Sequence, residues 1–145
     1  MKKQIRLLPM TLLATFITLA VGMTHAQYTT QAIRAVIPFT FNIGTQQFPP
    51  GEYNLSPARA SRETILISNQ KGPLIFVWTG AVEPRTSSDS PRLVFNRYGA
   101  QYFLEQIWEF DGAGRQLDKS RAEIQMGKLQ SSPPEQVAVA LAPHF

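Results

Sequence analysis

Apolar and polar residues alternate along much of the chain with a period of two. Between Ile33 and Ile43 every second residue is apolar, which places the apolar side chains on one face of an extended strand. Pro38 lies inside this run and has no amide hydrogen to donate, so we expect the strand to lie at a sheet edge or to bend there. Further strand patterns occur at residues 53–55, 64–68, 74–82, 93–110 and 137–141.

The segment 93–110, LVFNRYGAQYFLEQIWEF, predicts a β-hairpin. Gly99 and Ala100 suit a two-residue type II′ turn, in which glycine takes the first central position. This turn would pair Phe95 with Leu104 and Leu93 with Gln106. One face would then carry the predicted core residues Leu93, Phe95, Tyr102, Leu104 and Trp108.

The opposite face of this hairpin, together with one arginine near the turn, is the predicted surface for a partner or ligand. Its residues are Arg97, Phe103, Glu105, Ile107 and Glu109. Arg97 would either contact a tyrosine ring as a cation or cover the rim of the core with its aliphatic stem. Glu105 and Glu109 would lie about 13 Å apart on one strand. This separation is too large for the two carboxylates of a glycosidase, which lie about 5 to 9.5 Å apart.

A single helix is predicted at residues 120–130. Ser120 and Glu123 have the spacing of a capping box, in which each side chain bonds the other residue's backbone amide. Residues 111–119 are predicted to form a glycine-rich loop, and Trp78 and Trp108 are expected in the core, with ligand stacking as the alternative. The fold class is all-β, an antiparallel sandwich or small barrel of about seven strands with one short C-terminal helix.

The first 26 residues have the three-part pattern of a secretory signal peptide. Three basic residues precede an apolar stretch of about 16 residues, which is shorter than the roughly 20 that a membrane helix needs. Thr24 and Ala26 supply small residues at positions −3 and −1, so we expect cleavage after Ala26. An uncleaved N-terminal anchor is the alternative. Residues 27–145 are then one domain, and the protein is periplasmic or extracellular.

Removal of this signal peptide changes the charge balance. The whole chain has 14 Lys and Arg residues against 10 Asp and Glu residues; the signal peptide holds three of the basic ones, so the net charge of the remainder is about +1. The remaining arginines lie singly, and this pattern does not favour a nucleic-acid partner. The sequence has no cysteine, which excludes a disulfide-linked partner and thiolate metal sites.

Few residues of the mature chain suit catalysis. Its single histidine is His144, next to the C-terminus, where a Ser-His-Asp site is difficult to build. The glycines near residue 112 match no phosphate-binding pattern. We therefore expect a protein that is not an enzyme and that needs neither a cofactor nor a metal.

Four motifs together resemble a family of small exported bacterial proteins. They are IPFTF at 37–41, PPGEY at 49–53, FNRYGAQYFL at 95–104 and KSRAE at 119–123. The resemblance implies export and a single β-rich domain. The family has no assigned activity, so it supplies no catalytic or binding residue.

The expected function is that of an exported, non-enzymatic binding or envelope-associated module. Two alternatives remain open. The terminal Phe145, preceded by alternating apolar residues, resembles the C-terminal signal of outer-membrane barrels. A closed barrel would instead carry a small apolar ligand in its lumen.

Overall fold

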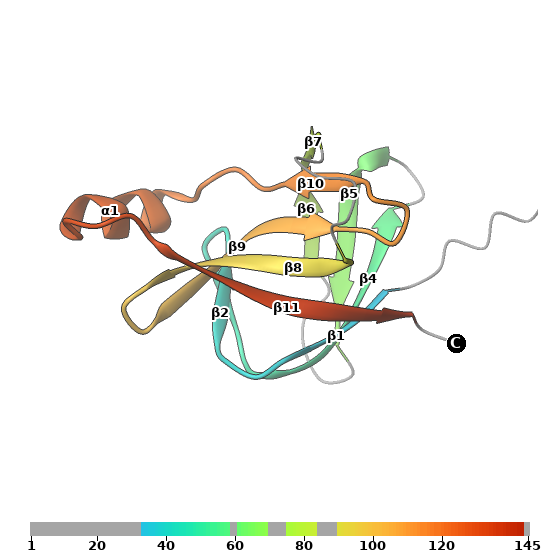
Figure 1. Cartoon of the computed structure of the whole chain (residues 1–145), viewed down its shortest axis with the longest axis horizontal. Coiled ribbons are helices and arrows are strands. Elements are labelled where there is room, and N and C mark those ends of the chain that lie inside the picture. Colours follow the sequence, from blue (N-terminus) through green and yellow to red (C-terminus); the bar gives the residue numbers. More distant parts are fainter. Residues whose placement is uncertain (1–32, 59–60, 70–74, 84–89, 144–145) are drawn as a thin grey trace, which may run out of the picture.

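The computed structural model describes residues 33–58, 61–69, 75–83 and 90–143 (Figure 1). The predicted signal peptide, the cleavage point after Ala26 and the terminal His144 and Phe145 lie outside these residues. The described residues form eleven β-strands and one α-helix.

The elements follow one another as mostly short strands, with the helix before the last of them. They are β1 (Ile33–Ile37), β2 (Phe41–Ile43), β3 (Gln46–Phe48), β4 (Gly51–Ala58), β5 (Ser61–Ser68), β6 (Ile75–Trp78), β7 (Gly80–Val82), β8 (Arg92–Tyr98), β9 (Gln101–Trp108), β10 (Gly114–Gln116), α1 (Arg121–Leu129) and β11 (Glu135–Pro143).

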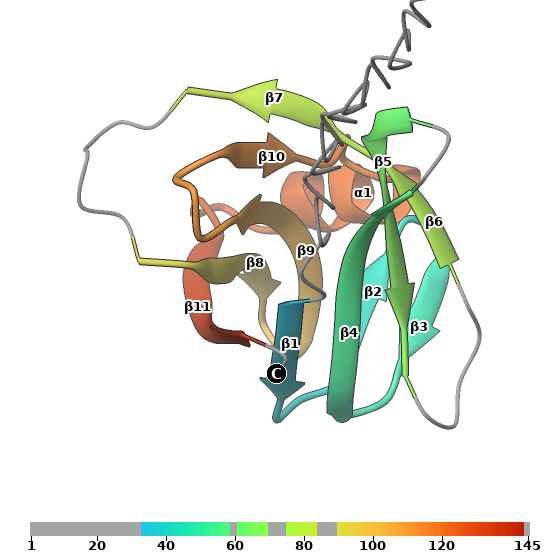
Figure 2. The same cartoon turned by 90° about the vertical axis from the view of Figure 1, so that its right-hand side faces the viewer.

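The strands form a curled, open sheet that makes a half-barrel (Figures 1 and 2). The order is β3-β2-β9-β8-β11-β1-β4-β5-β6, and β10 pairs with both β9 and β7. The ladders are antiparallel apart from one parallel contact, between Asn42 of β2 and Phe103 of β9. The predicted all-β fold with one short C-terminal helix is confirmed.

The eleven described strands outnumber the predicted seven for three reasons: two predicted strands break, β3 forms in the predicted turn before Gly51, and one predicted loop pairs. The run at 33–43 bends after Ile37, at the proline, as the missing amide donor predicts. The run at 74–82 is divided at Thr79, where the chain leaves β5 and joins β10. The prediction of a loop throughout 111–119 is wrong, because residues 114–116 pair with β7 and β9 on either side.

The core fills the concave side of the curled sheet. Its aromatic centre is Phe41, whose ring centroid lies 5.1 Å from that of Tyr53 and 5.5 Å from those of Phe48 and Phe95. The alternation in β1 is confirmed, because Ile33, Ala35 and Ile37 are buried, and Arg34 and Val36 between them are exposed. The strand with Trp78 also alternates, but this tryptophan points outward and is exposed, so its expected place in the core is wrong.

The hairpin turn is as predicted, but the pairing beyond it is not. Tyr98 pairs with Gln101 around the two turn residues, of which Gly99 alone has a positive φ, 60°. Phe95 pairs with Leu104 as expected, yet Val94 pairs with Gln106, so Glu105 is an extra residue in β9. This β-bulge exchanges the faces of all later residues in the strand.

Three residues of β9 therefore lie on the opposite face from that expected: Gln106, Ile107 and Trp108. Ile107, predicted on the ligand surface, pairs with Leu93 and is a core residue with 1% of its surface exposed. Trp108, predicted in the core, pairs with Arg92 on the convex side, where it is 4% exposed. Alternation does not reveal this bulge, because Ile107 and Trp108 are adjacent and both apolar, so either could face the core.

Candidate functional site

The five residues of the predicted ligand surface do not form one surface. Ile107 is in the core, and Phe103 is buried on the convex side, with its ring centroid 5.8 Å from that of Tyr98 in an edge-on contact. Arg97 lies at the rim, where its Nε donates to the Gly99 carbonyl at 2.8 Å. Its guanidinium lies 5.6 Å from the Tyr102 ring centroid, which is the first of the two alternatives considered for this residue.

The helix α1 packs against the turn end of the hairpin, and Figure 1 shows both at the same end of the molecule. Ser120 caps the helix as predicted, since its Oγ accepts from the Glu123 amide at 3.1 Å. The other half of the predicted capping box is wrong: the Glu123 carboxylate turns toward β8, where Asn96 Nδ2 donates to it at 2.8 Å. Tyr98 Oη donates to the same oxygen at 3.3 Å.

Glu123 therefore fastens the helix to the sheet. The residue is 3% exposed, and the Asn96 side chain that holds it is also buried. The helix approaches closely at Gly127, where an added Cβ would lie 3.6 Å from the Tyr98 ring. Burial, and then the neighbouring charge of Glu123, raise the pKa of Tyr98. Phe103 lies beneath this contact and does not offer an exposed surface.

The other end of the hairpin carries a groove on the convex side. Its volume is about 380 Å³, and strands β7 to β11 all contribute to it. The lining residues are Val82, Arg92, Val94, Glu105, Gln106, Trp108, Gln116, Gln136 and Ala138. Glu105 is the one residue of the predicted surface that lines it, and the bulge at this residue also places Gln106 and Trp108 there.

Trp108 forms a rigid wall of this groove. The Arg92 guanidinium lies 5.6 Å from its ring centroid, and the backbone of Gly114 packs against the same ring. A Cβ at Gly114 would lie 2.5 Å from a ring carbon, so only glycine fits there. The indole Nε1 donates to Gln106 Oε1 at 3.1 Å, which fixes the orientation of that amide.

The polar side chains of the groove also contact one another. Gln136 Nε2 on β11 donates to Glu105 Oε2 at 3.2 Å, so a hydrogen bond joins strands that are not neighbours in the sheet. A glutamine amide can donate two hydrogen bonds and accept two. The lining thus combines donors and acceptors with one carboxylate and one guanidinium.

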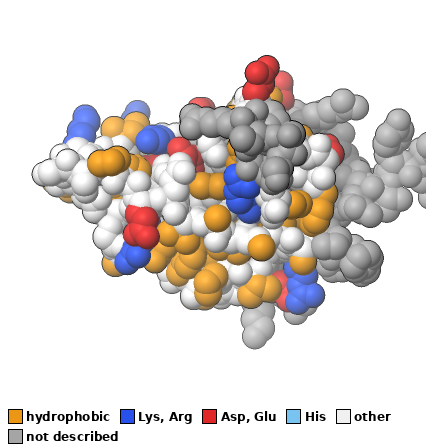
Figure 3. Space-filling model, in the orientation of Figure 1, with side chains coloured by type: hydrophobic (Ala, Val, Ile, Leu, Met, Phe, Trp, Pro, Cys, Tyr) orange, Lys and Arg blue, Asp and Glu red, His pale blue; other side chains and the backbone are white. Residues whose placement is uncertain are grey.

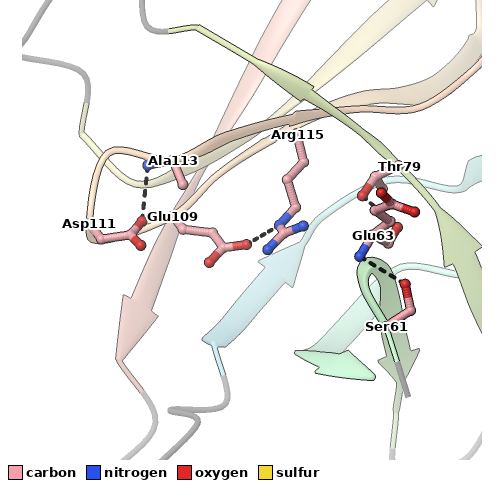
Figure 4. A network of polar contacts seen from close by, with 7 residues as sticks. All are labelled: Ser61, Glu63, Thr79, Glu109, Asp111, Ala113 and Arg115. Carbon is pink, nitrogen blue, oxygen red and sulfur yellow. Dashed lines mark hydrogen bonds and ion pairs between the residues drawn. The ribbon is translucent and has the colours of Figure 1, made fainter. Parts of the chain in front are cut away.

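The second glutamate of the predicted surface has a different environment. Glu109 forms an ion pair with Arg115 across the β9–β10 turn, and the two side chains are 15% and 18% exposed (Figure 4). In the same turn, Asp111 Oδ1 accepts from the Ala113 amide at 2.9 Å. Glu109 therefore stabilises one end of the half-barrel.

A separate contact drawn in Figure 4 is made by Thr79, where the chain passes from β6 to β7. Its hydroxyl donates to the Glu63 carbonyl at 2.9 Å.

Figure 3 shows the surface of the molecule from the side on which β11 and β8 lie in front. Single basic and acidic side chains are dispersed over this side, with uncharged surface between them. Within the described ranges, no three histidine, aspartate or glutamate side chains come together as a metal site would require. In the same residues, no helix has the length and apolar character needed to cross a membrane.

Comparison of the chain with protein-family models, with curated proteins and with solved structures finds no match.

Proposed function

We propose that the protein is an exported, non-enzymatic binding module that holds a neutral, hydroxyl-rich ligand, an oligosaccharide, in the convex groove. One observation carries the proposal. Five polar side chains from four strands converge on one groove: Arg92, Glu105, Gln106, Gln116 and Gln136. Export is supported by the sequence pattern of the first 26 residues.

The chemistry of these side chains favours hydroxyl groups. Amides, carboxylates and guanidinium groups are planar and can contact two neighbouring polar atoms at once. Val82 and Ala138 add apolar surface for the C–H faces of a sugar ring. The volume of about 380 Å³ is within the usual range for small-molecule sites.

The charges of the groove favour a ligand without charge. Glu105 lies in the lining together with Arg92, so a phosphate or carboxylate drawn to the guanidinium would also meet a carboxylate. Arg92 is further engaged, since it lies against Trp108 and its Nη1 donates to the Ser90 carbonyl at 3.1 Å.

A titration followed by NMR tests this function. The mature protein, labelled with ¹⁵N, is titrated with chitotetraose, cellotetraose and xylotetraose. We expect at least one to shift amide signals of β8 to β11, and the double variant Gln116→Ala, Gln136→Ala to bind it at least tenfold more weakly. Both residues are exposed, so the variant is expected to fold.

Gln101→Ala is the matched control, because Gln101 is an exposed glutamine of β9 at the far end of the strand. It is expected to bind as the unsubstituted protein does. If no neutral saccharide shifts the β8 to β11 signals, or if the double variant binds as well as the control, the proposed function is wrong.

A further inference from the structure

A different part of the molecule, the open seam of the half-barrel, has the features of a protein-binding site. The strands β3 and β6 are the two ends of the main strand order. On one side, β6 pairs with β5 from Thr64↔Trp78 to Ile67↔Ile75. On its other side β6 has no ladder partner among the described strands, so its outward backbone groups form an open sheet edge.

The side chains of β6 make this edge unusual. Ile75 and Val77 turn toward the core, whereas Phe76 and Trp78 are 61% and 64% exposed. Two large exposed aromatic side chains on one strand form an apolar patch. Open edges are usually protected by charge or proline, and the sequence IFVW has neither.

A groove of about 380 Å³ runs along this edge. Both ends of the sheet contribute to it, and Figure 2 shows β6 and β3 on the same side of the molecule. Its described lining includes Ile43, Gln46, Val77, Trp78, Leu117 and Asp118. The β2–β3 turn and the segment after β10 thus face β6 across the groove.

We propose that the seam binds an extended segment of a partner polypeptide, which adds a strand to the free edge of β6. Alternate apolar side chains of this segment contact Phe76 and Trp78. A basic residue of the segment lies near Asp118, which is the charged side chain of the described lining. This inference does not depend on the convex groove, which lies on other strands.

The shape of the groove favours a single strand over a second copy of the chain. Paired strands lie about 4.8 Å apart, so one strand fits beside β6. If a second copy paired its own edge strand with β6, the rest of its sheet would follow that strand into the groove. The β2–β3 turn lies on the far side of the groove and leaves no room for it.

Peptide display tests this inference. Random twelve-residue peptides are selected on the mature protein and then on its Trp78→Lys variant. We expect enriched peptides to alternate apolar and polar residues, to carry Lys or Arg, and to bind the Trp78→Lys variant at least tenfold more weakly. Hydrogen exchange with the best synthetic peptide should show new protection at the β6 amides.

Two further variants test whether the peptide contacts the Trp78 ring itself. Phe110→Lys is the matched control, because Phe110 is also an exposed aromatic residue but lies after β9, and it should leave binding unchanged. Trp78→Ala removes the ring without adding a charge and should also weaken binding, which separates loss of contact from repulsion. Circular dichroism melting shows that each variant folds.

Three outcomes would overturn the inference. The first is that selected peptides bind the Trp78→Lys and Trp78→Ala variants as well as they bind the unsubstituted protein. The second is that protection appears away from β6. The third is that light scattering finds a dimer that Trp78→Lys separates, in which case the occupant is a second copy.

Discussion

The two faces of the β8–β9 hairpin differ in what covers them. The concave face is apolar and packs into the core through Phe95, Leu104 and Ile107. The convex face includes polar groups among its buried side chains. At one end Asn96 donates a hydrogen bond to Glu123 of the helix, and at the other end Trp108 forms a wall of the groove. The first face holds the fold together, and the second face holds the helix and lines the groove.

The bulge at Glu105 is what separates these roles. If Glu105 paired regularly with Val94, alternation would bring Trp108 to the concave side and Ile107 to the convex side. Because Glu105 is bulged instead, the large indole lies on the convex side beside Gly114, and the smaller aliphatic side chain fits the core. The bulge therefore lets this sequence form both a packed core and a groove.

Exchanging the two side chains that follow the bulge is expected to have the largest effect. The double variant Ile107→Trp, Trp108→Ile keeps the bulge but puts the large indole at a core position that is 1% exposed and the aliphatic side chain beside Gly114. We expect the free energy of unfolding to fall by about 3 to 5 kcal/mol, measured by urea denaturation. Glu105→Ala keeps the bulge and both side chains in place and should change the free energy of unfolding by about 0.5 kcal/mol or less. Equal losses in the two variants would show that the two faces do not distinguish these side chains.

The polar contact at the other end of the convex face is expected to contribute less. Glu123→Ala leaves the Asn96 and Tyr98 donors without their acceptor, at a cost of about 1 to 3 kcal/mol in the free energy of unfolding. Glu123→Gln retains an acceptor oxygen and should cost less. The helix should lose protection from hydrogen exchange in the alanine variant before the sheet does. Unchanged protection of α1 would contradict the role given to Glu123.

A smaller effect is expected at the wall of the groove. Arg92→Ala removes the cation next to the Trp108 ring and should lower the free energy of unfolding by about 0.5 to 1 kcal/mol. The fluorescence of Trp108 should shift to longer wavelength as water reaches the ring. Arg121→Ala, at an exposed position of the helix, is the control and should leave both measurements unchanged.

The dependence of stability on pH in the alkaline range tests the contact between Tyr98 and the helix. The pKa of Tyr98 is raised in the folded protein, so the stabilisation is present below the usual tyrosine pKa, about 10, and is lost as pH rises through the folded value. Tyr98→Phe should therefore reduce the fall in stability above about pH 10. Burial also raises the pKa of Tyr53, so part of the fall should remain. A variant with the full alkaline fall would show that Tyr98 does not cause it.

Local patterns of the sequence were sufficient for several features. Alternation identified most of the strands and the buried face of β1, Gly99 identified the hairpin turn, and Ser120 identified the start of the helix. Each depends on residues close together in the chain, where side-chain direction and backbone preference follow from the sequence. Pro38 likewise marked a bend, because it lacks an amide donor.

The candidate site was predicted poorly, since only Glu105 of the five residues lines the groove. The groove joins strands β7 to β11, and no local pattern tells which distant strands become neighbours. Glu123 is a similar case: its spacing from Ser120 fits a capping box, but a buried Asn96 on β8 takes the carboxylate instead.

By itself, the sequence determined the class of fold, the hairpin turn and the capped helix, because these follow from period, backbone preference and neighbouring side chains. Only the tertiary structure decided the register beyond Leu104, the place of Trp78 and the open edge of β6. The physical reason is that a bulge and a free edge are properties of pairing between strands. They depend on which partner is present across the ladder, and that partner is distant in the sequence.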